Sequence, residues 1–277
     1  MIAIEANADT ISTVTIASNV EEVAGTQIQL AQGTAEVGVA AQTVTDLVIN
    51  STSKQATSVT IDSDNVSGFV LSATRAKADL NLSSDNTVSD TTLISSTKKG
   101  FNATIDARNE NTSITATKGK AEATFSGKSV NPTISNEGKG ETVTDFSAKA
   151  VGASLSTDKG AITASFEGKA KDIVVKAAKT KKGIDLSYEK ALTDGNFKLG
   201  KGADELVFGG AIKDSKANLG DDNKTDSVTI DRPGKSVIDI KNFGQEDLLI
   251  VRGDEFTAED ISNGAIDQFS GIGINLV

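Results

Sequence analysis

The sequence predicts an all-β protein, a parallel β-solenoid in which short strands coil around one axis with about 20 residues per turn. Two observations predict this fold: a dipeptide that recurs at a nearly constant step, and apolar residues that alternate with polar ones. The dipeptide is Lys-Gly, and it recurs six times down the middle of the chain, at Lys99-Gly100, Lys118-Gly119, Lys139-Gly140, Lys159-Gly160, Lys182-Gly183 and Lys201-Gly202. An antiparallel β-sandwich also accounts for short strands at regular spacing, but it does not normally repeat a dipeptide at a constant step.

The strands are predicted by period-two alternation, because successive side chains of a strand point to opposite faces. The best-matched units span residues 118–128 and 159–169, and their identical positions, among them Phe125 and Phe166, lie two periods apart. Alternation recurs, in chain order, at Val14 and Ile16, Ile28 and Leu30, Val59 and Ile61, Phe101, Ala103 and Ile105, Ile184, Leu186 and Tyr188, and Val228 and Ile230. We expect two or three strands per turn and about 14 turns, in a rod roughly 65 Å long at ~4.8 Å per turn.

The composition removes much ordinary enzyme chemistry. The chain has no Cys, His or Trp, one Tyr and one Met, and 37% of its residues are hydrophobic. Without Cys there is neither a disulfide framework nor a thiolate nucleophile, and without His there is no imidazole base or Ser-His-Asp triad. The share of apolar residues suits the thin core of a solenoid. We therefore expect a protein that is not an enzyme.

The charge is acidic overall and is distributed in stripes. The net charge is −10 and the pI about 4.7, which is unfavourable for general nucleic-acid affinity. Residues 1–95 carry three basic and eleven acidic side chains, residues 96–200 seventeen and twelve, and residues 201–277 eight and fifteen. The basic middle of one copy can meet an acidic end of another copy, so the stripes favour self-association; independently solvated faces are the alternative.

No apolar run is long enough to span a membrane, and residues 1–5 lack the basic and apolar regions of a secretory signal. These features leave three expectations: an intracellular protein, a virion protein released by lysis, or a protein exported through an uncleaved C-terminal signal.

A glycine- and aspartate-rich motif begins near residue 199. Leu199-Gly200-Lys201-Gly202-Ala203-Asp204-Glu205-Leu206-Val207 is followed by a poorer copy that ends at Asp214 and by Gly220-Asp221-Asp222. The motif resembles the calcium-binding nonapeptide of the RTX (hemolysin-type) family, G-G-x-G-x-D-x-U-x, with Leu199 in place of the first Gly. Glycines let such a turn bend and Asp supplies a hard oxygen, so the resemblance implies a Ca²⁺ site. The candidate metal residues are Gly200, Gly202, Asp204, Asp214, Gly220 and Asp222.

Two further expectations concern this motif. The Asp side chains can instead merely hydrogen-bond their own turns. The return of Gly-x-Asp from Gly202 to Gly220 has the length of two nonapeptides, which is the spacing that would stack two RTX corners on each other.

The resemblance covers only the C-terminal part of the chain, and it divides the chain into a solenoid, residues 1–198, and an RTX-like roll and cap, residues 199–277. In the family this region caps the roll and precedes an uncleaved secretion signal that ends in apolar residues, and residues 272–277 look similar. It implies export to the extracellular space or cell surface. It implies no enzyme activity, since RTX modules are attached to proteases, lipases, adhesins and surface-layer proteins alike.

Three functions fit these observations. The first is a non-enzymatic structural protein that assembles with itself into a surface layer or filament, similar in composition to bacterial surface-layer proteins. The second is a phage virion component such as a tail fibre, spike or decoration protein. The third is a β-helix enzyme acting on polysaccharide through carboxylates such as Asp62, Asp64 and Asp85, although Asp64 and Asp85 occupy equivalent turns one period apart.

A local basic cluster adds a possible partner. It consists of Lys176, Lys179, Lys181 and Lys182, and it can hold an anionic cell-surface glycan or simply form a solvated edge.

Overall fold

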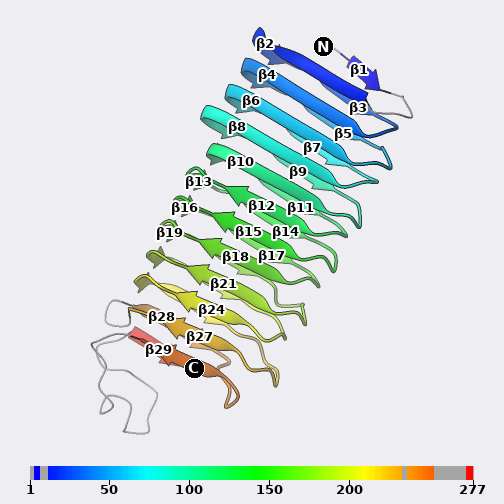
Figure 1. The fold of residues 1–277 in the computed structure, drawn as a ribbon. Helices are drawn as coiled ribbons and strands as arrows, with labels where there is room; N and C mark the ends of the chain where they lie inside the picture. The colour runs from blue at the N-terminus through cyan, green and yellow to red at the C-terminus, as the bar shows by residue number, and fades with distance from the viewer. Residues whose placement is uncertain (1–2, 7–11, 233–235, 253–272, 277) are drawn as a thin grey trace.

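The computed structural model is a parallel β-solenoid of about 11 turns with roughly 21 residues per turn, and it describes residues 3–6, 12–232, 236–252 and 273–276 (Figure 1). The predicted fold class is confirmed. The turns are fewer than the 14 expected, because each turn is slightly longer than 20 residues and because 31 of the 277 residues, most of them in 253–272, lie outside the described ranges.

Two sheets form the walls of the rod, and every pairing is parallel. Sheet A supplies one short strand per turn: β1 (Ala3–Ala6), β3 (Gln27–Leu30), β5 (Val48–Ser51), β7 (Val70–Ala73), β9 (Thr92–Ser95), β11 (Ser113–Ala116), β14 (Thr133–Asn136), β17 (Ser154–Thr157), β20 (Val174–Lys176), β23 (Asn196–Lys198), β26 (Ser215–Asn218), β28 (Val237–Lys241) and β30 (Gly273–Leu276). Ile272 and Val277 of the expected C-terminal signal lie outside the described residues.

Sheet B begins with long strands and continues with split ones. The long strands are β2 (Ser12–Ala24), β4 (Ala35–Thr45), β6 (Thr57–Ser67), β8 (Ala78–Ser89) and β10 (Phe101–Glu110). The split ones are β12 (Ala121–Phe125) and β13 (Ser129–Val130), β15 (Thr142–Phe146) and β16 (Ala150–Val151), β18 (Ile162–Phe166) and β19 (Ala170–Lys171), β21 (Ile184–Tyr188) and β22 (Leu192–Thr193), and β24 (Glu205–Phe208) and β25 (Ile212–Lys213), followed by β27 (Ser227–Ile230) and β29 (Leu248–Val251). Each turn thus has two or three strands, as predicted.

The core is a set of columns, in which a side chain packs on its equivalent one turn away. The predicted pair Phe125 and Phe166 belongs to such a column, with Phe146 between them and Tyr188 beyond. Neighbouring rings have centroids 5.0, 4.8 and 4.6 Å apart and are nearly parallel. These rings are fully buried, so the column both removes apolar surface from water and fixes the register of adjacent turns.

The first of three corners, which we call the Asx corner, joins sheet B to the next strand of sheet A. One residue per turn there has φ between 50° and 68°, a region that Gly tolerates freely and Asn and Asp more readily than other residues. These residues are Gly25, Asp46, Gly68, Asp90, Asn111, Asn131, Gly152, Asp172, Asp194 and Asp214. Side chains bond along the column: Asn131 Nδ2 donates to Asn111 Oδ1 at 3.3 Å, and Asn111 Nδ2 donates to Asp90 Oδ1 at 3.1 Å.

The second corner, the middle corner, interrupts sheet B at residues 126–128, 147–149, 167–169, 189–191 and 209–211. The third, the Lys corner, joins each strand of sheet A to the next strand of sheet B, and its loops form the column along the right side of Figure 1. The Lys corner contains the Lys-Gly dipeptides and most of the candidate metal residues.

Candidate functional site

The structure divides the six candidate metal residues between two corners. Gly200, Gly202, Asp204, Gly220 and Asp222 lie in Lys-corner loops that precede β24 and β27. Asp214 lies in the Asx corner, at the opposite end of sheet A, where its exposed carboxylate is 4.0 Å from Lys213 Nζ. The motif therefore does not gather around one point.

The glycines in these loops allow neighbouring turns to approach closely. A Cβ at Gly220 would collide with the carbonyl oxygen of Gly200, and one at Gly202 would collide with the backbone of Lys182. Gly220 thus stacks on Gly200, one full turn earlier. The expectation that Gly220 stacks on Gly202 is wrong, because a full turn here is longer than two nonapeptides.

The position of the Lys-Gly dipeptide within the Lys-corner loop changes between Gly160 and Gly183. A column of close backbone contacts runs through Gly100, Gly119, Gly140, Gly160, Thr180, Gly200 and Gly220. Thr180 takes the glycine position, with its hydroxyl donating to the carbonyl of Gly160 at 2.8 Å. Gly183 and Gly202 therefore lie beyond the column and stack on each other.

A column of three Asp residues is the most unusual feature of the C-terminal turns. Asp204 Oδ1 accepts from the N–H of Ile184 at 2.9 Å, and Asp226 Oδ1 accepts from the N–H of Asp204 at 2.8 Å. Asp247 continues the column by accepting from the N–H of Asp226 at 2.8 Å and from that of Gly244 at 2.6 Å. In earlier turns of this corner, the N–H at the start of a sheet B strand donates to a backbone carbonyl of the next turn, for example from Ala121 to Glu141. In the Asp column, an Asp carboxylate of the next turn accepts this hydrogen bond instead.

Of these three, the sequence motif identified only Asp204. Asp226 and Asp247 could have been found from their spacing, because each follows the preceding Asp of the column by about one turn and directly precedes a strand. The prediction that Asp side chains bond only their own turns holds for Asp222, whose Oδ1 accepts from the N–H of Lys224 at 2.7 Å. It is wrong for Asp204, which bonds the preceding turn.

Burial and like charge act together on this column. Asp204 is 3% exposed, and burial followed by the charge of Asp226 raises its pKa to about 8, against the opposing hydrogen bond from Ile184. Burial raises the pKa of Asp226 to about 6, and the hydrogen bond from the N–H of Asp204 offsets part of this effect. The folded state therefore favours the protonated forms of Asp204 and Asp226, because these carboxylates are poorly hydrated and lie near other negative charges.

The oxygens of this corner are a partial fit to a hard cation. Asp204 Oδ2 and Asp222 Oδ2 are buried and lack a hydrogen-bond partner, so both can accept a cation. Within the described part of the chain, however, no three acidic side chains are grouped closely enough to hold a metal ion. Any Ca²⁺ bound here would take most of its ligands from backbone carbonyls and water.

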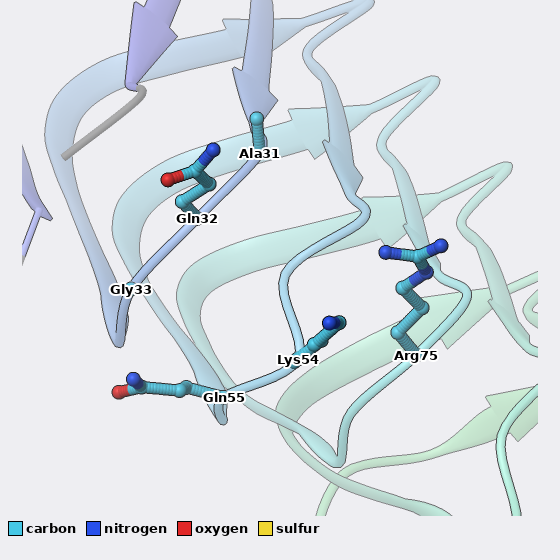
Figure 2. Close-up of a pocket in the computed structure, with 6 residues that line it drawn as sticks. All are labelled: Ala31, Gln32, Gly33, Lys54, Gln55 and Arg75. Atoms are coloured by element: carbon cyan, nitrogen blue, oxygen red, sulfur yellow. The ribbon is translucent and has the colours of Figure 1, made fainter. Parts of the chain in front are cut away.

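A hollow of about 400 Å³ lies at the N-terminal end of the Lys corner, and sequence reasoning did not identify it (Figure 2). Figure 2 shows Lys54 and Arg75 on the loops of successive turns, and neither has an ion-pair partner among the described residues. Gln55 Oε1 accepts from Thr34 Oγ1 at 2.7 Å. The lining residues are Ala31, Gln32, Gly33, Lys54, Gln55 and Arg75.

Two other predicted groups are placed as follows. Ser63 and Ser84 are register partners, so Asp64 and Asp85 belong to equivalent bends of sheet B, as expected. The four lysines of the basic cluster begin at the end of β20 and continue into the next Lys-corner loop.

No family model matches the chain, and neither a curated protein nor a solved structure is similar to it. The part of the chain that the structure describes contains no helix long and apolar enough to cross a membrane.

The Asp column makes a pH prediction. An unfolded Asp has a pKa near ~3.9, below the values of about 8 and about 6 in the folded Asp204 and Asp226. The folded state therefore binds more protons between these limits, and the free energy of unfolding falls as the pH rises from about 4 to about 8. We expect metal-free protein to lose a few kcal/mol between about pH 5 and about pH 8 in urea unfolding followed by circular dichroism.

The chain has no His, so few other groups titrate between about pH 6 and about pH 8. Asp204→Asn should remove most of the slope in that range, whereas Asp214→Asn at the exposed Asx corner should retain it. Equal slopes in the wild type and Asp204→Asn would contradict this account.

Proposed function

We propose that this protein is a non-enzymatic structural protein that assembles with copies of itself into an extracellular surface layer or filament. The observation that carries the proposal is the exposed C-terminal edge of the solenoid. Leu248 and Ile250 of β29 are 53% and 37% exposed, and Val237 of the adjoining turn is 45% exposed. Within the described residues, β29 pairs only with β27, so its other edge offers unpaired backbone groups to another chain.

The opposite end of the rod supports the same proposal. Strand β2 pairs only with β4 among the described strands, and like β29 it belongs to sheet B. Because all pairings are parallel, β2 of one copy can extend sheet B beyond β29 of another without a change of strand direction. Such a head-to-tail contact does not close on itself, so it generates an open array.

Substituting charges on the exposed edge tests assembly. Leu248→Lys with Ile250→Lys should abolish polymers without unfolding the chain, because like-charged exposed side chains on an edge strand block pairing. Ile94→Lys is the control, since the Ile94 side chain is as exposed as that of Ile250, at 37%, but lies in the middle of the rod. Sedimentation and negative-stain electron microscopy measure the outcome. A wild type that stays monomeric at every concentration, or an edge variant that still polymerises, would exclude this contact.

We also propose that Ca²⁺ binds at Asp204 and Asp222 and stabilises the Lys corner. It is supported by their two unpartnered buried oxygens, and a bound cation would offset the repulsion within the Asp column. Added Ca²⁺ should raise the free energy of unfolding at about pH 8 by roughly 1–3 kcal/mol, and Asp204→Asn should reduce this gain. The comparison is urea unfolding in chelator and in Ca²⁺, with Mg²⁺ as control. Equal curves in Ca²⁺ and chelator would remove calcium from the proposal.

A cell-surface glycan is the partner proposed for such a layer. Fractionation of native cells separates the cell-surface location from the virion alternative, because a layer protein remains with the envelope whereas a virion component purifies with particles.

A further inference from the structure

The Lys corner displays a continuous line of cations. Its loops from residue 52 to residue 204 contain thirteen basic and four acidic side chains over eight successive turns. We call the thirteen residues the basic ridge: Lys54, Arg75, Lys77, Lys98, Lys99, Lys118, Lys120, Lys139, Lys159, Lys179, Lys181, Lys182 and Lys201. Nearly half of the 28 basic residues of this acidic protein therefore lie along one edge of the rod.

Most of the ridge is not neutralised by the protein itself. Lys77 pairs with Asp79 at 2.7 Å, and Lys120 pairs with Glu122 and Glu141 at 3.2 and 3.8 Å. The other eleven cations have no ion-pair partner in the described ranges, and all eleven are exposed. An array of unpaired like charges repels itself, and a bound polyanion would relieve that repulsion.

The spacing of the ridge is set by the fold. Adjacent turns lie ~4.8 Å apart, so eight turns place cations at regular intervals over about 34 Å. A globular or singly charged ligand would engage only a few of them. A straight polymer with anionic groups at regular intervals would contact every turn.

Beside the ridge lies an uncharged face, the outer surface of sheet A, which we call the hydroxyl face because most of its side chains are Ser or Thr. From β3 to β17, the fourteen outward side chains of sheet A include no Asp, Glu, Lys or Arg. The row nearest the ridge contains Thr115, Ser135 and Ser156, which are register partners on successive strands. Ser135 Oγ donates to Thr115 Oγ1 at 3.2 Å, and these hydroxyls retain further hydrogen-bonding capacity.

The hollow in Figure 2 forms the N-terminal end of the ridge. Lys54, Arg75 and Lys77 are the only three basic residues in the first 95. All three lie in Lys-corner loops, and Lys54 and Arg75 line the hollow. The ridge therefore extends into a part of the rod that is otherwise acidic.

We propose that the basic ridge and the adjoining hydroxyl face bind a linear acidic polysaccharide, whose carboxylate or sulfate groups pair with the ridge cations while its sugar hydroxyls bond the face. The hydroxyl face favours sugar over a nucleic acid. The aromatic side chains of residues 52–204, the turns that carry the ridge, are all buried, so these turns offer no stacking platform for bases. This inference specifies the glycan of the proposed function, but it requires only the monomer, so it can hold where assembly fails.

Binding of purified probes tests the inference on a monomeric sample in calcium-free buffer of low ionic strength. The probes are polygalacturonate and dextran sulfate, with neutral dextran, polyphosphate and a single-stranded oligonucleotide for comparison. We expect at least one acidic polysaccharide to bind more tightly than the other three, with an affinity that falls as salt rises.

Matched triple variants locate the site. Lys118→Gln, Lys139→Gln and Lys159→Gln together should weaken binding about tenfold, because three exposed charge contacts are lost. Lys128→Gln, Lys149→Gln and Lys169→Gln remove the same charge from the middle corner of the same turns, and affinity should stay within about twofold.

A second variant tests for sugar contact. Thr115→Val with Ser135→Ala should weaken polysaccharide binding without changing any residual binding of polyphosphate. The inference is overturned if neither acidic polysaccharide binds, if the two triple variants lose affinity equally, or if the oligonucleotide or polyphosphate binds as tightly as the polysaccharides. Circular dichroism and urea unfolding verify that each variant is folded.

Discussion

In-register stacking of each residue on its equivalent one turn away is the constraint on which the rest of this structure depends. Backbone hydrogen bonds join the turns at the corners as well as in the sheets, for example from the N–H of Asn131 to the carbonyl of Val151 at 2.8 Å. Because the spacing between turns is fixed, a residue type that suits one turn at a given position suits the next. The Phe, Gly, Asn and Asp columns are four results of this constraint.

The same stacking has opposite consequences for the two kinds of charge. Carboxylates stacked inside the corner, as at Asp204 and Asp226, have raised pKa values because burial and mutual repulsion disfavour ionisation. Ammonium groups of the basic ridge lie at the ends of long side chains in water, so they stay charged and hydrated, and their mutual repulsion is screened without being removed. The first arrangement is expected to make stability depend on pH and, in our proposal, on Ca²⁺, whereas the second is the regular line of charge that we propose binds an external polymer.

The sequence predicted the solenoid because alternation and repetition are local properties. It identified Phe125 and Phe166 as two periods apart, and the structure confirms this with Phe146 between them. It did not predict which dipeptides stack, because loop lengths in the Lys corner vary: residues 158–161 make one loop and residues 177–183 the next. Those extra residues move Lys182-Gly183 out of the glycine column. The sequence alone does not show this shift, because the loop lengths become known only once the flanking strands are paired.

Cross-linking tests the central claim of in-register stacking most directly, since the chain has no Cys of its own. Ser135 and Ser156 are register partners on the successive strands β14 and β17, so cysteines there would have Cα atoms ~4.8 Å from each other, within disulfide range. Ser135→Cys with Ser156→Cys should form an intramolecular disulfide under mild oxidation. Ser135→Cys with Ser147→Cys, a pair closer in sequence but with Ser147 in the middle corner, should remain reduced. Cross-linking of the closer pair in sequence and not of the register pair would contradict the account.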